Sequence, residues 1–183
     1  MDLDFSKADP LARRIAIVPV VVIVGAVIAF MLGFRLEGRR PLTVDWRAHT
    51  VAESNFGVAA PGMLMVIRQM MRFDGEDAVA QTYAASDLGE DFSVSVVRRP
   101  DSDRRPFEAV AKSLGLGGTD ATQRADGLTQ FRHDVTLEGM RTQALLIFDD
   151  RMMYQLIVTS AAASFPTANA ERFFSSFRLL ESK

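Results

Sequence analysis

The sequence predicts an α+β protein in which one N-terminal transmembrane helix is followed by an antiparallel β-sheet domain covered by helices. A run of 20 residues, Ile15–Phe34, contains no charged residue and no Asn, Gln, Ser or Thr. Beyond residue 44, short segments that alternate polar and apolar residues, or are continuously apolar, indicate β-strands. Two other segments carry apolar residues at helical spacing, which indicates helices that pack on the sheet.

Composition and charge narrow the class of protein. The chain is 48% hydrophobic and 24% charged, which is typical of a folded protein. Its formal net charge is -2 and its basic residues are scattered, so no nucleic-acid partner is expected. The absence of cysteine excludes disulfides, thiolate catalysis, Cys-ligated zinc and iron–sulfur clusters.

The apolar run has the length of a membrane span. Twenty helical residues at about 1.5 Å each reach about 30 Å, the thickness of the hydrocarbon core. The run is longer than the apolar region of a cleaved signal peptide, so an uncleaved signal-anchor is expected. The basic residues on its two sides do not settle the orientation. Because Arg13 and Arg14 directly precede the run, we expect the N-terminus in the cytoplasm.

This reasoning divides the chain into four segments and gives it a location. The segments are a cytoplasmic N-terminal segment (1–14), the transmembrane helix (15–34), a polar tether broken by Gly38 and Pro41 (35–43) and a soluble α+β domain (44–183). The protein is expected in the cell inner membrane as a single-pass protein, with its C-terminal domain on the periplasmic side.

The soluble domain is expected to contain six to eight strands. The candidate segments are 46–51, 55–59, 63–73, 78–84, 92–98, 128–137, 140–148 and 152–160. The clearest hairpin joins 142–148 to 151–159 across Asp149-Asp150, because acidic residues accept tight-turn conformations. Both faces of this hairpin carry large apolar residues, so the sheet should be covered on both sides, by helices or by a second sheet.

Two helices are expected in the same domain. In the first, Pro106 suits the opening turn and Gly115 the end. The second follows Pro166, with Thr167 as the expected N-cap. Each has an apolar stripe at i, i+3, i+4 and i+7, formed by Phe107, Val110, Ala111 and Leu114 in the first and by Ala170, Phe173, Phe174 and Phe177 in the second.

Three short segments in a fixed order resemble a known family. They are Asn55–Pro61 (NFGVAAP), the Tyr154-x-Leu156 strand and the closing Arg172–Phe177 helix (RFFSSF). They resemble the bacterial relatives of the PsbP/DcrB-like fold. The resemblance implies an αβα sandwich around an antiparallel sheet, in lumenal or periplasmic proteins that dock on membrane complexes. It implies no catalytic residues, because the family has none in common.

No group of residues has the pattern of a catalytic or metal site. The only histidines, His49 and His133, are too few for a zinc site. Ser175-Ser176 belongs to an apolar-striped helix, and no G-x-S-x-G motif accompanies it. The adjacent carboxylates at 90–91 and 149–150 point to opposite faces of a strand or mark turns. We therefore expect no enzyme activity and no catalytic, cofactor-binding or metal-binding residues.

Methionine is unusually frequent in two places, with Met63, Met65, Met70 and Met71 in one segment and Met152-Met153 in the hairpin. We expect most of these residues to fill the core, because methionine fits irregular gaps. Two alternatives are a Cu(I) site of thioether ligands and an adaptable surface for a partner.

Two functions follow from these expectations. The first is a non-catalytic accessory subunit or assembly factor of a larger membrane protein complex, with the lipid bilayer and that complex as partners. The second is a membrane-anchored periplasmic module that binds a lipid or another small apolar ligand. A packed interior would favour the first function, and an apolar pocket of several hundred Å³ would favour the second.

Overall fold

The computed structural model describes residues 45–73, 76–98, 106–111, 121–149 and 151–180. The chain divides into two compact units. One unit comprises residues 1–39 and 105–118, and its described part is helix α3 (Phe107–Ala111). The other comprises residues 40–104 and 119–183 and contains all the β-strands described below.

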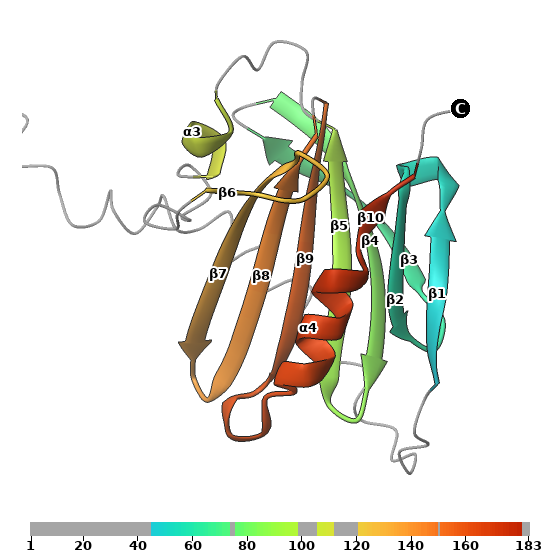
Figure 1. The fold of residues 1–183 in the computed structure, drawn as a ribbon, viewed down its shortest axis with the longest axis vertical. Helices are drawn as coiled ribbons and strands as arrows, with labels where there is room; N and C mark the ends of the chain where they lie inside the picture. The colour runs from blue at the N-terminus through green and yellow to red at the C-terminus, as the bar shows by residue number, and fades with distance from the viewer. Residues whose placement is uncertain (1–44, 74–75, 99–105, 112–120, 150, 181–183) are drawn as a thin grey trace, which may run out of the picture. The chain divides into compact units, whose positions relative to one another are not determined.

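Seven strands form a large, wholly antiparallel sheet (Figure 1). Its order is β3-β4-β5-β9-β8-β7-β6, so β3 and β6 are the edge strands. The strands are β3 (Met65–Phe73), β4 (Glu76–Asp87), β5 (Glu90–Arg98), β6 (Thr122–Gln123), β7 (Thr129–Leu137), β8 (Met140–Phe148) and β9 (Met152–Ala161). Hairpins connect most neighbours, but β5 pairs with β9 across a long stretch of sequence.

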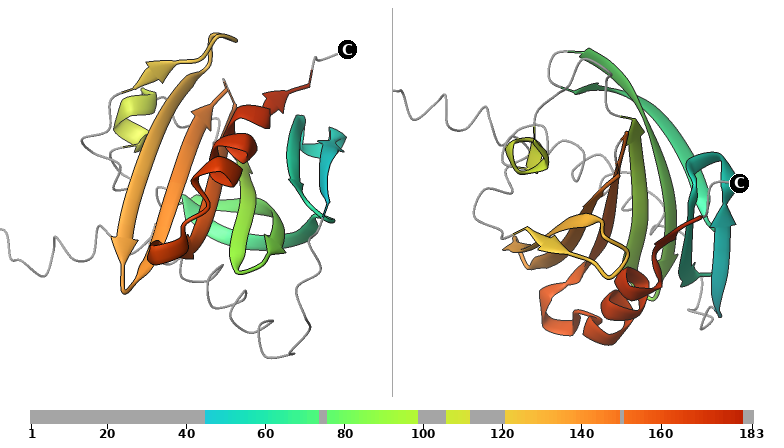
Figure 2. Two further views of the ribbon diagram at one scale, coloured as in Figure 1. Left: turned by 60° about the horizontal axis from the view of Figure 1, so that its bottom comes forward. Right: turned by 45° about the horizontal axis from the view of Figure 1, so that its top comes forward.

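A second, three-stranded sheet joins the two ends of the unit. Its order is β1 (Trp46–Val51), β2 (Phe56–Pro61) and β10 (Arg178–Leu179). The 3-10 helix η2 (Ala52–Ser54) connects β1 to β2, and Asn55 ends it in the left-handed conformation with φ 57°. Helix α4 (Thr167–Ser176) follows η4 (Ala162–Ser164) and leads into β10. In Figures 1 and 2, α4 lies across the face of the large sheet over β5 and β9.

The core lies between one face of the large sheet and the layer formed by β2 and α4. Phe56 of β2 stacks on Phe177, with ring centroids 5.8 Å apart, and meets Tyr83 edge-on at 5.2 Å. Phe173 of α4 contacts Phe92 of β5 at 5.4 Å. All five of these aromatic residues are at most 2% exposed, so the space between helix and sheet is closely packed.

The strand predictions are confirmed. All eight predicted segments coincide with strands, and the hairpin of β8 and β9 turns at Asp149, whose N–H bonds to the carbonyl of Met152. Residues 142–148 and 153–160 are all buried, which confirms that both faces of this hairpin are covered. The two-residue strands β6 and β10 were not predicted.

The predicted fold class is wrong. The described chain is mostly antiparallel sheet, with α-helices of only five and ten residues, so it is not an αβα sandwich covered by helices. The layer over the core consists of β2, which belongs to a second sheet, and the single helix α4. The N-cap of α4 is Pro166 and not Thr167, and no side chain caps this helix.

The helices that the structure describes do not include the predicted transmembrane helix. None of the helices among the described residues is long and apolar enough to cross a membrane. Residues 15–34, to which this helix was assigned, lie outside the described residues, as do the segments 1–14 and 35–43.

Candidate functional site

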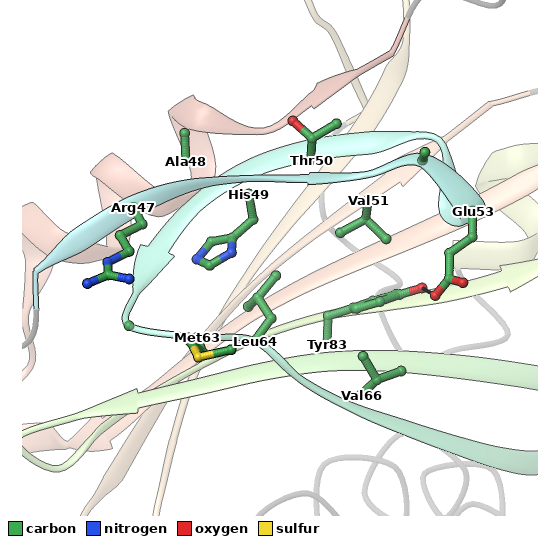
Figure 3. Close-up of a pocket in the computed structure, with 12 residues that line it drawn as sticks. Arg47, Ala48, His49, Thr50, Val51, Glu53, Met63, Leu64, Val66 and Tyr83 are labelled. Carbon is green, nitrogen blue, oxygen red and sulfur yellow. Dashed lines mark hydrogen bonds between the residues drawn. The ribbon is translucent and has the colours of Figure 1, made fainter.

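A groove of about 750 Å³ opens between β1 and the chain that leads from β2 into β3 (Figure 3). The pleat of β1 determines which side chains enter it. Arg47, His49 and Val51 pair in register with the inward-facing Ala60, Val58 and Phe56 of β2. Figure 3 shows these three side chains of β1 directed into the groove and those of Ala48 and Thr50 directed away. The opposite wall is formed by Met63, Leu64, Val66 and Tyr83.

One end of the groove is closed by a polar network around Tyr83. The Tyr83 hydroxyl lies 2.7 Å from Ser54 Oγ and donates to Glu53 Oε1 at 3.0 Å. Gln81 donates to the same carboxylate, and Arg68 forms an exposed ion pair with it at 3.9 Å. Burial raises the pKa of Tyr83, and the neighbouring Glu53 raises it further. Tyr83 therefore stays neutral at physiological pH, and these residues hold η2 on the large sheet.

The other end of the groove presents cationic and polar groups that have no partner. Arg47 makes no ion pair with any other residue that the structure describes. The Nε2 atom of His49 is buried and has no hydrogen-bond partner among the described residues. A buried polar atom without a hydrogen-bond partner is costly.

The hairpin of β3 and β4 exposes apolar side chains on the face that continues from the groove at Val66. Val66, Met70 and Val79, called here the edge patch, are 52%, 68% and 54% exposed. Met70 pairs with Val79, and Val66 pairs with Tyr83, which places all of them on one side of the sheet. The edge patch flanks the free edge of β3, whose only partner among the described strands is β4.

The histidines and serines singled out from the sequence do not come together. His49 lies on β1 of the small sheet and His133 on β7 of the large one. Asp134 bonds to Arg141 and Gln143, and the hydrogen bond from Arg141 lowers the pKa of the Asp134 carboxyl. Among the described residues, no group of three or more His, Asp or Glu is placed to hold a metal ion.

Ser176 and the adjacent carboxylates Glu90 and Asp91 form hydrogen bonds that hold elements of the fold together. Ser176 Oγ donates to the carbonyl of Phe173 at 2.8 Å and accepts the N–H of Ala59 at 2.8 Å, which ties α4 to β2. Glu90 accepts a hydrogen bond from Asn169, and Asp91 accepts one from Ser86. These bonds hold α4 and the turn between β4 and β5 in place.

The expectation that the methionines fill the core is wrong for three of them. Met63, Met65 and Met70 are 81%, 44% and 68% exposed, whereas Met153 is buried as expected. The side chain of Met71 lies outside the described residues. The exposed methionines lie on or beside an edge strand, which favours the alternative of an adaptable partner surface over that of core filling.

The sequence did not indicate the groove, because its walls come from segments whose packing is set by the fold. The sequence does show that Arg47 and His49 share one face of a short strand, because they alternate with Ala48 and Thr50. Comparison with models of known protein families gave no match, and comparison with curated proteins gave none either. The resemblance to the PsbP/DcrB-like fold therefore stays a prediction.

Proposed function

We propose that the chain is a non-catalytic accessory subunit or assembly factor that binds a partner protein along strand β3. The observation that carries this proposal is the edge patch of Val66, Met70 and Val79 beside a free sheet edge. Met70 and Val79 are cross-strand neighbours, and exposed apolar side chains that lie side by side in this way are typical of interaction sites.

The strand itself supports the proposal. β3 has nine residues and no proline, and its described partner on the sheet is β4 alone. Proteins commonly protect such edges with charged side chains, proline, bulges or short length, and of these β3 has the charged side chain of Arg68. A partner that adds a strand to β3 would gain main-chain hydrogen bonds and would cover the edge patch at the same time.

The packed interior also supports an interaction role. Phe56, Phe92 and Phe173 fill the space between α4 and the large sheet, so this space has no room for a ligand. Methionine supports the same role, because the flexible side chains of Met63 and Met70 adapt to the surface of a partner.

Site-specific photocrosslinking in cells tests the proposal. A photoreactive phenylalanine analogue replaces Met70 in one variant and Leu137 in a matched control, since these residues are 68% and 65% exposed on different strands. We expect one discrete protein to be crosslinked from position 70 and not from position 137. Equal crosslinking from both positions, or from position 70 only to a second copy of the chain, would contradict the proposal.

A further inference from the structure

We propose that the groove between β1 and β3 is a binding site for a long-chain monocarboxylate, with the carboxylate held by Arg47 and His49. The groove shares Val66 with the edge patch, but this proposal rests on Arg47 and His49 of β1, which take no part in partner binding at β3. The groove of about 750 Å³ has the size of a small-molecule site.

The charge distribution along the groove sets the orientation of the ligand. Glu53 lies at one end, where Tyr83, Gln81 and Arg68 already satisfy its carboxylate. Arg47 lies toward the other end with no ion pair among the described residues. An anionic head is therefore attracted to the Arg47 end and repelled from the Glu53 end.

His49 supplies the second contact for the head. Its Nε2 atom is buried and lacks a partner among the described residues, and Figure 3 shows the ring directed into the groove. In the tautomer that carries the proton on Nε2, this atom donates a hydrogen bond to a carboxylate oxygen. Arg47 donates from its guanidinium to the same group, and such charge-assisted bonds are stronger than neutral ones.

The apolar part of the groove accommodates the chain of the ligand. Val51 lies on the same face of β1 as Arg47 and His49. Four residue steps along a strand place residues 47 and 51 about 13 Å apart. Leu64 and Val66 face this stretch from the opposite wall, next to the ring of Tyr83. An extended aliphatic chain in this position buries apolar surface that the protein otherwise leaves in contact with water.

Calorimetric titration of the full-length chain with dodecanoate, below its micelle concentration, tests the proposal. The neutral dodecanol and the cationic dodecyltrimethylammonium are the comparison probes. We expect dodecanoate to bind more tightly than either, because the other two cannot accept the hydrogen bonds of Arg47 and His49 as an anion does.

Two variants and a matched control localise the binding. Arg47→Gln and His49→Phe are each expected to weaken dodecanoate binding about tenfold, while dodecanol binding stays unchanged. Arg151→Gln, at an exposed turn that does not line the groove, is the control and is expected to bind as the unchanged chain does. Dodecanoate that adsorbs to other surfaces of the protein contributes equally to all three variants, so a difference between them reports binding in the groove.

The proposal is overturned by any of three results. The first is that dodecanoate does not bind the unchanged chain. The second is that dodecanol binds as tightly as dodecanoate. The third is that Arg47→Gln binds dodecanoate as tightly as Arg151→Gln does.

Discussion

Single hydroxyl groups at the interface of α4 and β2 show how the layers are held together. Ser175 and Ser176 are adjacent, yet only Ser176 bridges two elements, because its Oγ accepts the N–H of Ala59. Ser175 Oγ bonds only to the carbonyl of Arg172 within its own helix, at 3.3 Å. The sequence correctly placed both serines on a helix, but it could not show which one faces β2.

Ser176→Ala is expected to lower the free energy of unfolding by about 1–2 kcal/mol, because the N–H of Ala59 loses its partner in a partly buried place. Ser175→Ala is the matched control and should change the free energy of unfolding by less than about 0.5 kcal/mol. Urea denaturation followed by circular dichroism measures both values. Equal losses in the two variants would show that the contact between Ser176 and Ala59 does not stabilise the fold.

The two tyrosines differ in their polar contacts although both are buried. Tyr83 bonds to Ser54 and Glu53, whereas the Tyr154 hydroxyl is buried with no hydrogen-bond partner among the described residues. Tyr83→Phe is expected to cost about 1–2 kcal/mol of unfolding free energy, and Tyr154→Phe about 0. Urea denaturation at pH 7 compares them. A larger loss in Tyr154→Phe than in Tyr83→Phe would contradict this assignment.

Tyr154 also makes the stability depend on pH in the alkaline range. Burial, and then the charge of Asp149, raises the pKa of Tyr154 from 10.0 to about 12. In the unfolded chain, Tyr154 ionises near its ordinary pKa of 10.0. The folded state is therefore fully stable toward ionisation of Tyr154 below pH 10, and the free energy of unfolding falls as the pH rises from 10 to about 12. In Tyr83→Phe, absorbance at 295 nm should show the remaining tyrosine ionising near pH 12 or on unfolding. Ionisation of the folded protein near pH 10 would contradict the burial of Tyr154.

At the scale of the elements, the hairpin turns show where local sequence decides structure and where it does not. Alternating or continuously apolar segments predicted β7, β8 and β9, and each of these strands pairs with its neighbour in sequence. The two-residue turn between β4 and β5 has positive φ at both Leu88 (47°) and Gly89 (91°), as the turn between β7 and β8 has at Glu138 (50°) and Gly139 (77°). A left-handed conformation is unfavourable for a branched side chain and easier for asparagine.

Leu88→Asn is expected to raise the free energy of unfolding by about 1 kcal/mol, because Leu88 is 57% exposed and little apolar burial is lost. Leu137→Asn is the control, since Leu137 is also exposed but is not among the residues with positive φ. Thermal unfolding of both variants gives the comparison. Stabilisation of both, or of neither, would show that the conformation of Leu88 is not the cause.

At the scale of the whole unit, a second sheet was one of the two coverings that the sequence allowed, but the strand pairing that forms the small sheet could not be predicted. The small sheet pairs Arg178 and Leu179 with Gly57 and Phe56, more than a hundred residues away, and a two-residue strand has no periodicity to detect. The failed expectation of a helix-covered sandwich has the same origin. The apolar stripe of α4 was visible in the sequence, but the pairing of β1, β2 and β10 into a second sheet depends on contacts between the two ends of the unit.

The functional surfaces follow from this arrangement. Because β1 and β2 form their own sheet, β3 is left as the edge strand of the large one and the groove opens between β1 and β3. The sequence alone shows the methionines and Arg47 as residues. It does not show that they are exposed or that they lie near one another, because both depend on how the two sheets pack.

Hydrogen–deuterium exchange of the chain, free and in complex with the protein crosslinked at position 70, tests the central claim that β3 is the docking strand. We expect slower exchange in the bound state for the backbone N–H groups of residues 65–73, because added main-chain hydrogen bonds protect an edge strand. Residues 129–137 of β7 serve as the internal reference and should be unchanged. Protection of β7 with no change along β3 would contradict the account.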